Sequence, residues 1–257
     1  MKEFDRLIDI VARLRDPQDG CPWDLKQTHR SLVPNFIEEL YEVIEAIQSG
    51  DDDHLCEELG DLTLHIVMQV RIARERGAFV MSEALNRICD KLVRRHPHIF
   101  GDTQAGSAAD VKLNWERIKL REKAAQRKSI LEGIPRSMPA LIVAQRMQEK
   151  AAAANFDWPG PDNVMLKLRE EIEEFEYARR HESPERVEDE LGDLLFTLVN
   201  LARKLDIDAE ATLKRGADKF ERRFKAVEES YRARGLDMAD HSLEQLDKVW
   251  DEVKEEE

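Results

Sequence analysis

The motif ELGDL occurs twice in this sequence of 257 residues, at 58–62 and again at 190–194. Each copy sets two carboxylates and a glycine in an apolar run, although glycine weakens a helix by roughly 1 kcal/mol relative to alanine. The same shift of 132 positions also places Glu39 and Glu42 on Glu171 and Glu174. Four acids that recur in register predict two similar halves, and this repeat constrains the fold more than any other feature.

Composition favours helices in both halves. Only 11 glycines and 9 prolines are present, and stretches of Glu, Lys, Arg, Leu and Ala outnumber aromatic or β-branched runs. We therefore predict an all-α protein of two tandem helical-bundle halves, each built on a carboxylate-bearing helical hairpin that a basic helix follows. The hairpin turns are expected at 48–53 and 179–185, with Ser183 as N-cap and Pro184 as the first helical residue.

The halves are expected to meet in a segment that contains proline. Pro135 and Pro139 interrupt helical periodicity between the two copies of the repeat. We predict an N-terminal half at 1–128, a junction at 129–140 and a C-terminal half at 141–257. A polar loop is expected at 101–110, inside the first half.

The acids of each half are spaced for one helix face. Glu39 and Glu42 lie three residues apart and project together, as do Glu58 and Asp61, so the hairpin brings the two pairs face to face. In the second copy, a helical projection at roughly 100° per residue gathers the polar groups into a narrow stripe. The stripe is formed by Glu190, Asp193, Thr197 and Asn200. The rest of that helix is expected to be buried through Leu194, Leu195, Phe196, Leu198, Val199 and Leu201.

Such a stripe predicts a metal site. Carboxylates among apolar neighbours are costly unless they are hydrogen-bonded or bound to cations, and four hard oxygen ligands suit Mg²⁺ or Mn²⁺. The expected ligands are Glu171, Glu174, Glu190 and Asp193 in the second half and Glu39, Glu42, Glu58 and Asp61 in the first. Glu38, Glu39, Glu42 and Glu45 alone also fit a solvated face, because 37% of the residues are charged. Gly60 and Gly192 are expected to let a neighbouring helix or a ligand approach the backbone.

Charge and cysteine content exclude several other classes. A formal net charge of −14 argues against a nucleic-acid or anionic-membrane partner. The N-terminus lacks the apolar core of a signal peptide, and no apolar stretch approaches the roughly 18 residues that span a bilayer. Cys21, Cys56 and Cys89 form no CxxC pair, which fits reduced thiols in core or surface positions of a cytoplasmic protein.

Over nearly its whole length the chain resembles the MazG nucleoside triphosphate pyrophosphohydrolases, of the all-α NTP pyrophosphatase group. The matching segments are LRDPQDGCPWD (14–24), EELYEVIEAI (38–47), EELGDL (57–62), RRHPHIFGD (94–102), IPRSMPAL (134–141), NFDWP (155–159), KFERRF (219–224) and VWDEVK (249–254). The resemblance implies Mg²⁺-dependent hydrolysis of canonical or non-canonical, ribo or deoxy nucleoside triphosphates at the α-phosphorus, giving a monophosphate and pyrophosphate. It also implies a homodimer, which an exposed apolar stripe on each hairpin favours independently.

Further site residues follow from the resemblance. It makes the eight acids the metal ligands, Lys219 and Arg223 triphosphate contacts, and Lys119 and Trp250 neighbours of the nucleotide. Lys219 and Arg223 are four residues apart and can converge on one anion, although such residues are also common surface charges.

The attacking water needs a group that orients it or removes its proton. Glu170 and Glu38 each adjoin a predicted metal ligand and are candidate bases, but their helical angle differs by about 100° from that of the ligands. No Walker-type glycine loop is present, so phosphate binding by backbone amides is not expected.

The second half is predicted to be the main catalytic half. Lys167 and Arg186 precede metal ligands by four residues, and Asn200 lies on the polar stripe, so all three are expected to bind substrate. Their first-half counterparts are Asn35, His54 and Met68, with fewer groups for a triphosphate. The first half is therefore expected to hold a different nucleotide or to serve mainly in structure. Lys91 and Arg95 still supply basic groups there, which counts against this assignment.

Two rival functions stay open at this point. A di-iron carboxylate bundle uses Glu-x-x-His on two helices, whereas both copies here read Glu-x-x-Asp. His65 nevertheless lies on the first-half stripe, where the second half has Thr197. The other rival is a catalytically silent helical protein that binds nucleotide without turnover or mediates interactions.

Overall fold

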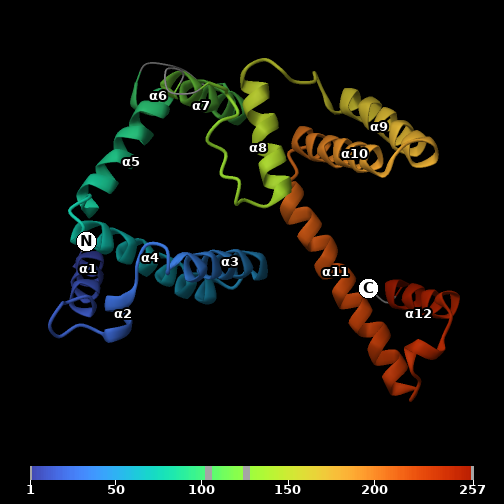
Figure 1. Cartoon of the computed structure of the whole chain (residues 1–257), viewed down its shortest axis with the longest axis horizontal. Helices are drawn as coiled ribbons and strands as arrows, with labels where there is room; N and C mark the ends of the chain where they lie inside the picture. The colour runs from blue at the N-terminus through green and yellow to red at the C-terminus, as the bar shows by residue number, and fades with distance from the viewer. Residues whose placement is uncertain (1, 102–105, 124–127, 256–257) are drawn as a thin grey trace. The chain divides into compact units, whose positions relative to one another are not determined.

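The computed structural model describes residues 2–101, 106–123 and 128–255. Within these ranges the chain is helical, without a β-strand, which confirms the predicted all-α class (Figure 1). Two compact units are present, Met1–Ala105 and Gly106–Glu257. The second unit begins before the predicted junction at 129–140, because α7 (Ala108–Lys123) packs on α8 (Ala140–Ala153). The division into repeat halves at 1–128 and 141–257 stays a prediction.

The first unit is built around a long central helix, α4, on which α1, α3 and α5 pack. Val11 of α1 and Leu32 are buried against Val67, Met68 and Ile72 of α4, and these five form the core of the unit. The helices of this unit are α1 (Lys2–Leu14), α2 (Pro22–Lys26), α3 (Val33–Ser49), α4 (Asp52–Glu75), α5 (Met81–Arg95) and α6 (Pro97–Phe100).

Helices α3 and α4 form the first carboxylate-bearing hairpin. Helix α3 ends at Ser49 and is capped by Gly50, whose φ of 72° is in the left-handed region that favours glycine. Asp51 then caps α4, since its side chain accepts hydrogen bonds from the backbone N–H groups of Asp53 and His54 at 3.1 and 3.0 Å. A tight turn of this kind returns the chain antiparallel, so the acids of the two helices come opposite one another.

The second unit contains two hairpins, α9–α10 and α11–α12, and helix α8 contacts both α10 and α11. Val227 and Tyr231 of α11 pack against Val249 of α12 in a small core. The remaining helices of this unit are α9 (Pro161–His181), α10 (Pro184–Lys204), α11 (Ala209–Ala233), the 3₁₀ turn η2 (Met238–Asp240) and α12 (Leu243–Glu255). Ser183 and Pro184 are the N-cap and first residue of α10, as predicted, although the Ser183 side chain makes no capping hydrogen bond.

Helix α10 is not buried on most of its circumference, and this expectation was wrong. Glu190, Thr197 and Val199 are buried, whereas Leu195 and Leu198 are exposed. The physical reason is that α9 and α8, its main neighbours, cover only part of α10. The polar stripe therefore lies partly on the covered side, and apolar side chains are left in solvent.

The two repeat glycines do not make room for another part of the chain. Beyond the glycine's own turn of helix, a Cβ atom added at Gly60 or Gly192 meets no atom of the described chain within 4 Å. The expected approach of a neighbouring helix is therefore wrong for the described residues, because the facing helices of each hairpin meet other positions. The approach of a ligand stays a prediction.

Two further sequence expectations concern the surface. None of the described helices has an apolar stretch long enough to cross a membrane. Cys21, Cys56 and Cys89 are free thiols, and the latter two are exposed.

Candidate metal centre and nucleotide site

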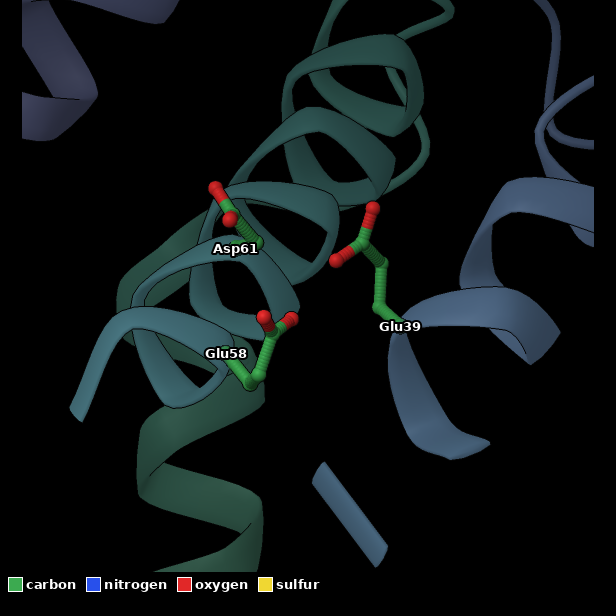
Figure 2. A group of neighbouring side chains, drawn as sticks. All are labelled: Glu39, Glu58 and Asp61. Carbon is green, nitrogen blue, oxygen red and sulfur yellow. The ribbon is translucent and has the colours of Figure 1, made fainter. Parts of the chain in front are cut away.

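The first-half hairpin brings three of its four predicted acids together. Glu39 of α3 meets Glu58 and Asp61 of α4, and one carboxylate oxygen of each lies within 4.8 Å of the others. Figure 2 shows the Glu39 carboxylate turned toward α4, where Glu58 and Asp61 occupy successive turns. We refer to Glu39, Glu58 and Asp61 as the first acid cluster.

Glu42 lies beside the first acid cluster but outside it. Partial desolvation raises the pKa of its carboxyl, and repulsion from Glu58 and Glu39 raises that pKa further. The fourth predicted ligand is therefore close enough to be affected by the negative charge of the cluster. A divalent cation between the helices relieves this repulsion, which is the physical reason to expect one here.

The second-half hairpin repeats the arrangement with a different third member. Glu171 and Glu174 of α9 meet Glu190 of α10, again with one oxygen of each within 4.8 Å of the others. Glu171 is 5% exposed and Glu190 6%, whereas the Glu174 side chain is 50% exposed. Asp193 is exposed and lies outside this group. We refer to Glu171, Glu174 and Glu190 as the second acid cluster.

Two basic side chains contact the second acid cluster and offset part of its negative charge. The Lys167 Nζ donates to Glu170 at 2.7 Å and lies 3.0 Å from Glu171 and 3.8 Å from Glu174. The hydrogen bond to Glu170 is the main cause of a raised Lys167 pKa, which desolvation opposes and Glu171 supports. Arg186 forms an ion pair with the buried Glu190. Both basic side chains therefore lie beside the acids that follow them by four residues, as the sequence predicts.

The exposed member of the second acid cluster also has a perturbed carboxyl group. Desolvation raises the pKa of Glu174 most, the Lys167 charge lowers it, and repulsion from Glu171 raises it again. The balance is a raised pKa despite the nearby ammonium group. Desolvation and repulsion thus outweigh the lysine at Glu174, and a bound cation would favour the charged form of this carboxyl.

Asn200 is held by a different contact from the expected one. Its Oδ1 accepts a hydrogen bond from Arg203 at 2.7 Å. Arg203 and Lys204 also form ion pairs with Asp157, which secure the loop before α9 to the end of α10. Sequence reasoning missed Asp157, although it lies within the NFDWP segment. Binding of substrate by Asn200 stays a prediction.

Lys119 belongs to a chain of ion pairs between α7 and α8. Its Nζ lies 3.1 Å from Glu116, which is 3.0 Å from Arg146, and Arg146 also pairs with Glu149. Glu116 and Glu149 are buried, so this network fastens the two helices to one another. These ion pairs do not test whether Lys119 contacts the nucleotide, which stays a prediction.

Lys219, Arg223 and Trp250 lie on the α11–α12 hairpin rather than on the α9–α10 hairpin that carries the acids. The Trp250 ring packs on the ring of Phe220, with 5.2 Å between ring centroids. Phe220 is the residue that follows Lys219 in the chain. Trp250 thus has a packing role in the small core of this hairpin. Its predicted place near a nucleotide, and those of Lys219 and Arg223, stay predictions.

The candidate bases are exposed. Glu170 is 58% exposed in its side chain and is bound to Lys167, while Glu38 lies on the solvent side of α3. Glu170 shares a lysine with the second acid cluster without being part of it, which agrees with its different helical angle. Its role in activating water is not tested by this geometry.

Two histidines accompany the first acid cluster. The His54 Nε2 lies 3.1 Å from Glu58, and the His65 Nε2 lies 3.5 Å from Glu39. The four-residue spacing of His54 from Glu58, and of His65 from Asp61, was the available signal that they share a face. Sequence reasoning noted both residues but did not predict these contacts.

Both clusters fit a divalent cation in their donor chemistry. Oxygen atoms from two helices converge in each, and a carboxyl group at each has a raised pKa caused by desolvation and neighbouring acids. Carboxylate oxygens are the ligands that Mg²⁺ and Mn²⁺ prefer.

Comparison with known proteins places these hairpins in a family. The model of the MazG nucleotide pyrophosphohydrolase domain matches residues 27–100 and 160–228, so each match contains one acid cluster. A nucleoside triphosphate pyrophosphohydrolase of Escherichia coli K12 is 45% identical over all of this chain and 99% of its own length. A nucleoside triphosphate pyrophosphohydrolase/pyrophosphatase MazG of Thermotoga maritima is 44% identical over 98% of this chain and 95% of its length.

A nucleoside triphosphate pyrophosphohydrolase of Mycobacterium tuberculosis is 36% identical over 58% of this chain and 46% of its own length. The full-length relatives therefore share both halves, whereas this one aligns with little more than half of the chain. The double domain match and the full-length identities agree with the repeated acid hairpins that the structure shows. The chain belongs to the MazG nucleotide pyrophosphohydrolase family.

Proposed function

We propose that this protein hydrolyses nucleoside triphosphates to nucleoside monophosphates and pyrophosphate, with Mg²⁺ as the required ion and Mn²⁺ as a substitute. The names of its full-length relatives support the reaction. The observation that carries the assignment to a site is the second acid cluster, where three convergent carboxylates lie beside a lysine and an arginine. A triphosphate site needs acidic side chains that bind a metal cation and positively charged side chains that bind phosphate.

Glu171, Glu174, Glu190 and, after a rotamer change, Asp193 would hold the metal. A bound Mg²⁺ supplies neutralisation of phosphate charge and a lowered pKa for water. Lys167 and Arg186 already lie at the acids, and both can exchange a carboxylate partner for a phosphate oxygen. Arg186 is half-exposed, so its guanidinium group is accessible to an incoming nucleotide.

The remaining residues would complete the substrate site. Lys219 and Arg223 are proposed to bind the triphosphate, Lys119 and Trp250 to approach the nucleotide, and Asn200 to contact sugar or phosphate. Glu170 is proposed to orient the attacking water, because the lysine that it binds also contacts the metal ligands. Release from Lys167, when that lysine turns to phosphate, frees the Glu170 carboxylate for this task.

The second half is proposed as the main catalytic half, with a different or mainly structural role for the first. Lys167 and Arg186 give the second acid cluster permanent positive partners. The partners of the first acid cluster are the imidazoles of His54 and His65, which offer phosphate neither an ammonium nor a guanidinium group.

A homodimer is proposed as the working assembly. Exposed apolar residues lie along both hairpins, among them Ile37, Leu40, Ile66, Leu191, Leu195 and Leu198. Burying such stripes against a second copy is the usual way that helical hairpins complete a bundle. We also propose a cytoplasmic protein whose partner is the nucleotide and not nucleic acid, given the net charge of −14.

The test is pyrophosphate release from a panel of canonical, deoxy and damaged nucleoside triphosphates, with and without Mg²⁺. Glu171→Gln and Glu190→Gln should each lower the rate by about 10²-fold or more, as for loss of a group that stabilises transition-state charge. Glu173→Gln is the matched control, because Glu173 is an exposed acid of the same helix outside the cluster.

Three results would contradict the proposal. Nucleotide binding without pyrophosphate release would identify the silent binding protein. A purified protein that is coloured by iron would favour the di-iron bundle. Unchanged rates in both Gln variants, with folding verified by circular dichroism, would place the reaction elsewhere.

A further inference from the structure

The two acid clusters differ in the groups that neutralise them. In the second cluster these groups are an ammonium and a guanidinium group, from Lys167 and Arg186. Neither has a lone pair at neutral pH, so neither can ligate a metal. In the first cluster the corresponding contacts come from two imidazoles, His54 and His65, which can. The halves therefore share acids but not the full set of donor atoms.

His65 is built into the first-half site. It follows Asp61 by four residues on α4, so both side chains lie on the same helix face. Its side chain is only 12% exposed, and its Nε2 lies 3.5 Å from a Glu39 oxygen of the first acid cluster. The edge-to-face contact with the Phe36 ring, at 6.2 Å between centroids, restricts rotation of the imidazole.

The other ring nitrogen of His65 has no hydrogen-bond partner within the described part of the chain. Nδ1 is fully buried there, so contact with the protein does not explain the cost of its burial. The imidazole thus faces the cluster with Nε2, while among the described residues Nδ1 has no hydrogen-bond partner and Nε2 has only a long contact with Glu39. Binding of Nε2 to a cation leaves Nδ1 unpaired, but it adds a ligand bond far stronger than the long contact with Glu39, which offsets the cost of burying the ring.

The matching position in the second half has no such donor. Thr197 occupies it, with a buried hydroxyl side chain that cannot supply a nitrogen ligand. A site of carboxylates alone suits Mg²⁺, whereas added imidazole favours first-row transition ions, which bind nitrogen more strongly.

We propose that His65 is a nitrogen ligand of the first-half site and that this site prefers a first-row transition ion to Mg²⁺. The second acid cluster then takes Mg²⁺ together with the nucleotide, so the two halves hold different ions. This inference rests on the proposed binding of divalent cations by the acids, but not on turnover.

His54 is not assigned as a ligand. Its side chain is 41% exposed in the first turn of α4, and no ring contact within the described residues fixes it. It stands where the second half has Arg186, so its counterpart is a phosphate-binding group and not a ligand. His54 therefore serves as the internal control, because it also contacts an acid of the first cluster.

The test measures Mn²⁺ binding to the full chain in which Glu171→Gln and Glu190→Gln disable the second cluster. Pulsed electron paramagnetic resonance of bound Mn²⁺ detects ¹⁴N coupling from an imidazole ligand, and calorimetry gives the affinities for Mn²⁺ and Mg²⁺. His65→Thr installs the second-half residue in the first half. His65→Gln is a second variant of similar length, in case the threonine variant does not fold.

We expect ¹⁴N coupling in this background and in His54→Asn, and its loss in both His65 variants. Mn²⁺ affinity should fall about 10-fold or more when His65 is replaced, with a much smaller effect on Mg²⁺. Bound Mn²⁺ without ¹⁴N coupling, or coupling that survives replacement of His65, would overturn this inference alone. Failure of the background protein to bind any Mn²⁺ would overturn it together with the proposed first-half metal site, while pyrophosphate release by the parent tests the proposed reaction separately.

Discussion

The Lys167 ammonium group lies 3.0 Å from the Glu171 carboxylate and 3.8 Å from that of Glu174. One lysine thus neutralises two acids of the second cluster, and a metal ion bound there competes with it for the same oxygens. The exchange is favourable when a phosphate replaces the lost carboxylates as the partner of Lys167. Metal and nucleotide are therefore expected to bind this half together more readily than either does alone.

Lys167→Gln should separate these two effects. Loss of the competing charge should raise the affinity of the second cluster for Mg²⁺ in the absence of nucleotide, which calorimetry measures. Loss of the phosphate contact should lower kcat/KM for the nucleotide about 10- to 100-fold, as for a charged hydrogen bond of about 1.5–3 kcal/mol. Lys26→Gln, an exposed lysine of α2, is the control and should change neither quantity. A fall in both Mg²⁺ affinity and kcat/KM would contradict the competition.

The assignment of the main catalytic half is tested by paired removal of equivalent acids. Glu174→Ala should abolish Mg²⁺-dependent turnover, because it removes a member of the second acid cluster. Glu42→Ala should retain the greater share of activity, since Glu42 flanks a cluster that lacks lysine and arginine partners. Both variants should stay folded, because each loses an acid whose pKa is raised partly by repulsion from like charges. A larger loss for Glu42→Ala reverses the assignment.

Asp157 should contribute stability that depends on pH. Desolvation tends to raise the pKa of its carboxyl, but hydrogen bonds from Arg203 and Lys204 outweigh it and hold this pKa below the ordinary 3.8. The contribution is therefore complete above that ordinary value and is lost as pH falls through the lower folded-state pKa. Asp157→Asn should lower the free energy of unfolding by about 1–3 kcal/mol at neutral pH, because two mostly buried cations lose their partner.

Urea denaturation at several pH values measures this contribution. The gap between the parent and Asp157→Asn should be constant near neutral pH and shrink below about pH 4. Asp247→Asn, at an exposed position of α12, should differ from the parent by no more than about 0.5 kcal/mol. A gap that widens on acidification would show that the ion pairs do not form as described.

The exposed apolar residues of α10 give an expectation for assembly. Light scattering should find a dimer at micromolar concentration, and Leu195→Lys should shift it toward monomer by placing a charge in the apolar stripe. Leu243→Lys is the control, since Leu243 is exposed at the start of α12, which belongs to neither acid hairpin. A monomeric parent protein would contradict the prediction.

The sequence by itself determined the helices and the positions of the acids along them. Spacings such as Glu58 to Asp61 depend only on the local period of a helix, and the Ser183–Pro184 start of α10 depends only on local backbone preference. The same holds for Lys167 and Arg186, which reach their carboxylates within one helix at a spacing of four residues. Local rules therefore sufficed for both hairpins and for two of the basic partners.

Only the tertiary structure decided which acids meet and which faces are covered. The offset between α3 and α4 admits Glu39 to the first acid cluster and leaves Glu42 beside it, while that between α9 and α10 admits Glu174 and leaves Asp193 out. The contact of His65 with Glu39 and the exposure of Leu195 depend on the same packing. Such features are set by how two helices rotate and slide against one another, and the period of either helix alone carries no information about that relation.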